Sequence, residues 1–159
     1  MLSALGVVLL YLGSVVEVVD ISMAVIASLF CVFAVIEYGG SAPWLVFSVT
    51  AVLSLILLPN KTPAVMYAFF FGFYPILKEQ FEKMKSVTAW ILKEIVFNVA
   101  LVLIFFAVKY LLTIPDMLFT MYVILVVGCE VVFVLYDIAL TRLISLYVYR
   151  LRKRFKLKK

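Results

Sequence analysis

Long apolar stretches, separated by short polar or turn-forming segments, dominate the pattern of this chain. Six apolar segments follow one another, at residues 2–16, 21–38, 44–58, 64–77, 87–112 and 117–149. Continuous apolar runs without polar alternation are typical of membrane-spanning helices rather than of barrel strands. The pattern therefore predicts an all-α integral membrane protein, a compact bundle of about six transmembrane helices.

The breaks between the segments carry turn chemistry, with Gly-Gly-Ser-Ala-Pro at 39–43 and Pro-Asn-Lys-Thr-Pro at 59–63. The first and third segments, 2–16 and 44–58, are near the lower length limit for crossing a bilayer. One of these two segments could therefore be re-entrant, which is an alternative to six full crossings.

Composition supports the membrane assignment, since 67% of the 159 residues are apolar and 14% are charged, with a mean hydropathy of +1.24. A soluble domain usually has about 45–50% apolar and about 25% charged residues. Six helices of about 20 residues would use about 120 positions, which leaves no room for a soluble catalytic domain. We expect one transmembrane domain at 1–149 and a basic tail at 150–159.

Basic residues are unevenly distributed, because seven of the fourteen lie in residues 150–159. Three more, Lys78, Lys83 and Lys85, separate the fourth and fifth segments, whereas the opposite loops hold only two. The positive-inside rule then places 78–86 and the C-terminal tail in the cytoplasm, and six crossings place the N-terminus there too. We expect a multi-pass protein of the bacterial cytoplasmic membrane, whose tail contacts anionic lipid rather than nucleic acid.

Ionisable residues within apolar segments are costly, so they are candidates for function. Lys93 and Glu94 lie in the fifth segment, and Glu130 and Asp137 lie in the sixth. A short break joins these segments, so we expect antiparallel packing that pairs Lys93 with Asp137 at matching depth. The same depth argument pairs the Asn98 amide with Glu130. Such pairs either hold two helices together or line a polar cavity that binds a solute or relays protons.

Trp90, Glu94 and Asn98 recur at every fourth position, so they form one stripe along the fifth segment. An aromatic ring beside a carboxylate and an amide could orient a ligand, although Trp90 alone is more often an interfacial anchor.

The fourth segment is rich in aromatic residues from Tyr67 to Tyr74, and Pro75 predicts a kink near residues 71–74. Gly72 allows a neighbouring helix or ligand to come close. This stretch would suit a planar, aromatic solute, although lipid-facing phenylalanines are an equally simple interpretation. The candidate solute-binding residues are Tyr67, Tyr74, Trp90, Glu94, Asn98 and Glu130.

Small residues in the second segment form small-xxx-small pairs, Ala24 with Ser28 and Ala27 with Cys31. These pairs allow close helix contact, either within the bundle or with another membrane subunit. Ala24, Ala27 and Ser28 are therefore candidates for docking a partner.

The sequence lacks the residues and motifs of common metal sites, hydrolases and nucleotide-binding proteins. There is no histidine, no CxxC pair, and no Walker A, GxSxG, HExxH or GxGxxG motif. We expect no metal, no cofactor and no catalytic residues, so an enzyme is not predicted.

Six short helices, both termini inside, small loops and a basic C-terminal end together resemble the S components of energy-coupling-factor vitamin transporters. This resemblance implies uptake of a small, vitamin-like solute bound within the bundle, with a membrane partner subunit and an ATPase. That family docks its partner through an Ala-x-x-x-Ala pattern, for which Ala24/Ser28 and Ala27/Cys31 are the nearest equivalents here.

A second hypothesis is a non-catalytic membrane scaffold, a subunit of a larger complex such as a cell-morphogenesis assembly. Its polar residues would serve only to hold helices together.

Overall fold

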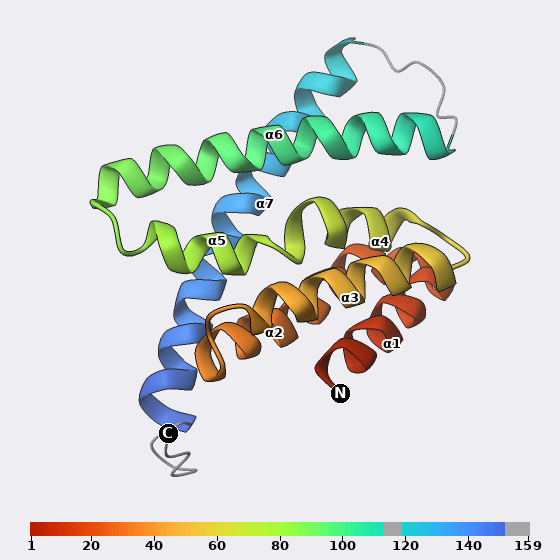
Figure 1. Ribbon diagram of the computed structural model, residues 1–159. Helices are drawn as coiled ribbons and strands as arrows, with labels where there is room; N and C mark the ends of the chain where they lie inside the picture. The colour runs from red at the N-terminus through yellow and green to blue at the C-terminus, as the bar shows by residue number, and fades with distance from the viewer. Residues whose placement is uncertain (113–118, 152–159) are drawn as a thin grey trace. The chain divides into compact units, whose positions relative to one another are not determined.

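The computed structural model describes residues 1–112 and 119–151, and all of the regular structure in these ranges is helical. The all-α class predicted from the sequence is confirmed for these residues. The α-helices (Figure 1) are α1 (Leu2–Val15), α2 (Asp20–Glu37), α3 (Ala42–Leu57), α4 (Thr62–Met66), α5 (Tyr74–Phe81), α6 (Ser86–Leu112) and α7 (Phe119–Leu146). A 3₁₀ turn, η1 (Glu17–Val19), and two π-helical turns, η2 (Tyr67–Phe71) and η3 (Tyr147–Leu151), complete the set.

Three helical stretches are long and apolar enough to cross a membrane, namely Asp20–Glu37, Ser86–Ala107 and Ile124–Tyr149. Helices α1 and α3 are apolar as well, but they have only 14 and 16 residues. A fully spanning helix needs about 20 residues, so six complete crossings stay a prediction.

The chain forms two compact units, residues 1–114 and residues 115–159. The first unit contains α1 to α6, and the second contains α7. Of the predicted basic tail, residues 152–159 lie outside the described residues.

Turn residues set the helix ends close to the predicted positions. Gly39 and Gly40, which follow α2, have φ values of +60° and +57°, a conformation that glycine adopts without steric cost. Pro43 then lies in the first turn of α3, where its missing N–H is not needed. After α3, the Asn60 side chain accepts a hydrogen bond from the Thr62 N–H (3.0 Å) at the start of α4.

Helix α2 is the centre of the first unit, because it contacts α1, α3, α4, η2 and α5. In Figure 1, α1, α2 and α3 lie side by side. The small side chains of α2 make this packing possible, and five of them are 0% exposed: Ala24, Ala27, Ser28, Cys31 and Ala34. Small residues allow the backbones of neighbouring helices to approach closely.

The fourth apolar segment is a broken helix, which confirms the predicted kink. Its first part, α4, passes into the π-helical turn η2, where the Gly72 N–H donates to the Tyr67 carbonyl (2.8 Å). The regular helix is interrupted at residues 72 and 73, whose backbone angles stay in the right-handed helical region. It begins again with α5, which has Pro75 in its first turn. We call residues 62–81 the broken segment.

Candidate functional site

The broken segment carries a cluster of aromatic side chains in the core of the first unit. Tyr67 and Tyr74 are both 0% exposed. The Phe70 ring lies 5.0 Å from the Tyr74 ring and 5.3 Å from the Phe97 ring of α6, measured between centroids. On the other side, the Phe47 ring of α3 lies 6.2 Å from the Tyr67 ring. These five residues form the aromatic cluster, which ties the broken segment to α3 and α6.

Gly72 is required where α3 meets the broken segment. A Cβ atom at this position would lie 2.5 Å from Cδ2 of Phe47 and 2.8 Å from Cε1 of Tyr67. Both distances are below normal contact, so a larger side chain would displace an aromatic ring. The neighbouring element predicted to approach Gly72 is therefore α3, through Phe47.

Helix α6 turns a different side toward this core than the sequence suggested. Its buried positions are Ala89, Lys93, Phe97 and Ala100. The predicted stripe lies on the adjacent, more open side. There, Trp90 is 40% exposed, Glu94 is half-buried, and Asn98 is exposed and donates to the Glu94 carbonyl (3.0 Å). Within the first unit, Phe97 rather than Asn98 contacts the aromatic cluster.

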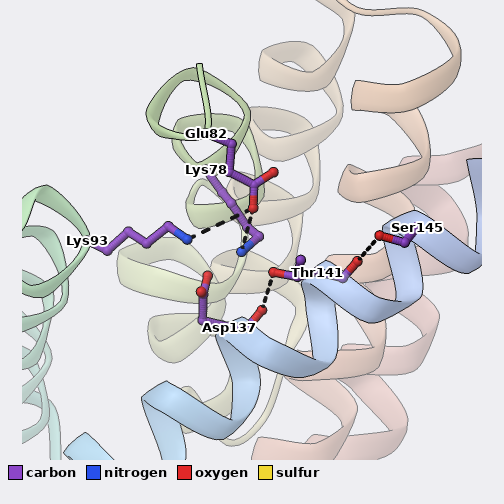
Figure 2. A network of polar contacts seen from close by, with 6 residues as sticks. All are labelled: Lys78, Glu82, Lys93, Asp137, Thr141 and Ser145. Atoms are coloured by element: carbon purple, nitrogen blue, oxygen red, sulfur yellow. Dashed lines mark hydrogen bonds and ion pairs between the residues drawn. The ribbon is translucent and has the colours of Figure 1, made fainter. Parts of the chain in front are cut away.

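Two buried lysines meet one carboxylate where α5 leads into α6, as Figure 2 shows. The Lys78 ammonium lies 3.0 Å from Oε1 of Glu82, and the Lys93 ammonium lies 3.9 Å from the same oxygen. The side chains of Lys78 and Lys93 are 1% and 7% exposed, whereas that of Glu82 is 42% exposed. We call these three residues the lysine–glutamate cluster.

Lys93 has a further contact, since its ammonium lies 5.5 Å from the centre of the Trp90 ring. A cation within about 6 Å of an indole face is attracted by the ring quadrupole. The position of Lys93 is therefore supported from both α5 and α6.

A second ion pair in the same stretch shows what is unusual about Lys78. Glu79 and Lys83 form a pair of the same four-residue spacing, at 2.9 Å, but their side chains are 43% and 68% exposed. An exposed pair of this kind contributes about 0–1 kcal/mol and needs no functional explanation. A lysine kept away from solvent is costly to fold, so Lys78 is a functional candidate.

The sequence pattern places Lys78 after the fourth apolar segment, where a helix leaves the bilayer, and the structure places it within α5. Helix α5 continues to Phe81, and the connection to α6 is only residues 82–85. The spacing contained a signal for this, because Lys78 follows Tyr74 by four residues and so shares its helix face. Lys78 still lies close enough to the helix end to count in the positive-inside rule.

Helix α7, in the second unit, carries a line of polar side chains that bond along the helix (Figure 2). The Thr141 hydroxyl donates to the Asp137 carbonyl (2.8 Å), and the Ser145 hydroxyl donates to the Thr141 carbonyl (2.9 Å). Glu130, a predicted solute-binding residue, is half-buried in the same helix. The predicted Lys93–Asp137 and Asn98–Glu130 pairs each combine residues from both units, and they stay predictions.

The candidate docking residues Ala24, Ala27 and Ser28 lie inside the first unit. All three are 0% exposed, and the Ser28 hydroxyl donates to the Val25 carbonyl (2.6 Å) of its own helix. In this arrangement the small-xxx-small pairs serve the packing of α2 against its neighbours. A partner subunit would have to contact other residues.

In the described ranges, no three His, Cys, Asp or Glu residues are grouped so that they could hold a metal ion. Cys31 and Cys129 are free thiols, and the Cys31 sulfur lies 3.7 Å from the Pro43 carbonyl oxygen.

In comparisons with known proteins, no family model matched the chain, and no curated protein or solved structure matched it significantly. The resemblance to S components therefore rests on architecture alone.

Proposed function

We propose that the protein is a membrane transport component that binds a small solute at the broken segment. The observation that carries this proposal is the interruption of the helix at residues 72–73, flanked by three fully buried polar side chains. These are Tyr67 and Tyr74, each 0% exposed, and Lys78, also 0% exposed. The proposed setting is a multi-pass protein of the bacterial cytoplasmic membrane.

A break inside an apolar helix supports this proposal on general grounds. Irregular backbone is tolerated at membrane depth only where it is buried in protein or lines a cavity. Discontinuous helices form the substrate sites of many transporters, because their free backbone groups can bind a ligand. π-helical turns such as η2 are also frequent at functional sites.

The side chains around the break favour a solute with a planar, apolar part. Aromatic rings offer large flat contact areas, and tyrosine hydroxyls can fix the orientation of polar atoms. The aromatic cluster supplies the rings, and Tyr67 and Tyr74 supply the hydroxyls.

The proposal includes a membrane partner subunit and an ATPase. The 159 residues contain no nucleotide-binding motif, so energy for transport would come from a separate subunit. The architectural resemblance to vitamin-transporter S components supports this division of labour.

Thermal unfolding of the detergent-solubilised protein against a panel of vitamins and nucleobases tests the proposal. We expect at least one compound to raise the unfolding temperature of the wild type. Tyr74→Phe removes one buried hydroxyl and keeps the ring, so it should weaken binding of that compound by about 1 kcal/mol, roughly fivefold. Tyr38→Phe is the control, because Tyr38 is 68% exposed at the end of α2.

A flat response of the wild type to every compound, with intact assembly into a larger complex, would contradict solute binding. That outcome would favour the scaffold hypothesis instead.

A further inference from the structure

The lysine–glutamate cluster arranges two ammonium groups around a single oxygen atom. Oε1 of Glu82 lies 3.0 Å from the Lys78 ammonium and 3.9 Å from the Lys93 ammonium. The two lysines come from different helices, α5 and α6, so their convergence depends on the packing of this hairpin. The position of Oε1 is therefore a place where the fold favours a negative charge.

Glu82 is the least firmly held member of this cluster. Its side chain is 42% exposed, while those of Lys78 and Lys93 are 1% and 7% exposed. Glu82 is also the C-cap residue of α5, where the helix dipole disfavours a carboxylate. The Glu82 side chain can thus turn into solvent with little loss of packing.

The lysines would stay in place after such a movement. Lys78 is 0% exposed, and Lys93 keeps its contact with the Trp90 ring at 5.5 Å. The site can therefore exchange one anion for another without rebuilding its cationic side.

From this geometry we propose that the Glu82 Oε1 position is a phosphate site. A phosphate oxygen of the ligand replaces the Glu82 carboxylate between Lys78 and Lys93. Lysine binds phosphate as a point charge, whereas planar carboxylate recognition is the speciality of arginine, which is missing from this cluster. Where the ligand is the transported solute, this inference rests on the proposed function and specifies that the solute carries phosphate.

Inorganic phosphate is the first probe, titrated into detergent-solubilised protein at constant ionic strength and followed by thermal unfolding. Glu82→Gln removes the competing charge but keeps the size of the side chain, so we expect it to bind phosphate about tenfold more tightly than the wild type. Adding Lys93→Gln to this variant should reverse the gain. Glu79→Gln and Lys83→Gln, at the exposed pair of the same spacing, are the matched controls and should match the wild type.

Equal phosphate affinities for Glu82→Gln and Glu79→Gln would overturn the proposal, and so would no response in any variant. Lys93→Gln provides a second check should a variant at Lys78 fail to fold. Because Lys78 and Glu82 pair within the α5 stretch, at 3.0 Å, their contact does not require Lys93, which comes from α6.

The source of the phosphate is tested in nanodiscs, with phosphatidylcholine alone or mixed with phosphatidylglycerol. Stabilisation by soluble phosphate in pure phosphatidylcholine, dependent on Lys93, supports a solute. Lys93-dependent stabilisation only in the phosphatidylglycerol discs supports the phosphate of an anionic lipid headgroup at the same site.

The two proposals can fail separately. A compound whose binding depends on Tyr74 but is unchanged in Lys93→Gln and Glu82→Gln would overturn the claim that the solute carries phosphate and leave solute binding intact. If no compound in the panel stabilises the protein but Glu82→Gln shows the expected response to phosphate, solute binding is overturned and the phosphate site stands.

Discussion

Lys78 and Lys83 make the same kind of ion pair within a few residues of each other, but only Lys78 is buried. Replacing Lys78 removes a charge-assisted contact and leaves the Glu82 carboxylate, which is partly exposed and can regain water. We expect Lys78→Met to lower the free energy of unfolding by about 1.5–3 kcal/mol. Lys83→Met should change it by less than about 0.5 kcal/mol.

Chemical unfolding of both variants in the same detergent measures this difference. Similar values for the two lysines would mean that Lys78 is solvated in the folded protein, and its assignment to the site would be wrong.

Among the residues of the site, some could be selected from the sequence and others could not. Tyr67 and Tyr74 could be selected in advance because an aromatic run before a proline is conspicuous. Lys78 could not, because its neighbours Glu79, Glu82 and Lys83 are charged as well and resemble a helix leaving the bilayer. Burial separates Lys78 from these neighbours, and burial depends on the helices packed around α5.

At the scale of single elements, helix ends were predictable and helix faces were not. Glycine and proline mark the ends, as at Gly39, Gly40 and Pro43, since their backbone preferences are local. Helix α6 is apolar on all sides apart from a few polar positions. The periodicity of its apolar residues therefore does not identify the side that packs against the core. The predicted stripe through Trp90 and Asn98 is therefore one position away from the buried side through Lys93 and Phe97.

The close packing around Gly72 in the broken segment predicts how a larger side chain there affects stability. A methyl group there would overlap the Phe47 and Tyr67 rings, at 2.5 Å and 2.8 Å. Gly72→Ala should therefore destabilise the protein by about 1–3 kcal/mol, the usual effect of overpacking. Gly128→Ala, in α7, is the control, since an added Cβ meets nothing within 4 Å in the part of the chain that the structure describes.

Gly128→Ala should be neutral or stabilising by up to about 1 kcal/mol, because alanine favours a helix over glycine. Thermal unfolding of the two variants decides the matter, and an unchanged unfolding temperature for Gly72→Ala would show that α3 does not pack against the break.

For the whole molecule, the sequence predicted the helical class and the membrane character, since both follow from composition and long apolar runs. The division into residues 1–114 and 115–159 was not predicted, because the sequence has no linker composition near the boundary. The number of full crossings depends on α1 and α3, whose 14 and 16 residues are short for a bilayer.

The orientation in the membrane gives a prediction at this scale. Lys83 and Lys85 in the connection after α5, together with the basic residues 150–159, should place that connection in the cytoplasm. Met84→Cys, made in a background with Cys31→Ala and Cys129→Ala, provides a label site that is 49% exposed.

A membrane-impermeant maleimide should label this cysteine only after the cells are opened. Labelling in intact cells would reverse the orientation, and with it the side from which the lysine–glutamate cluster is reached.

Mass spectrometry of the small molecules that co-purify with the protein is the sharpest test of solute binding at the broken segment. We expect a compound that is enriched with the wild type and with Tyr38→Phe, and depleted with Tyr74→Phe. The absence of any enriched compound, or the same amount with all three proteins, would contradict it.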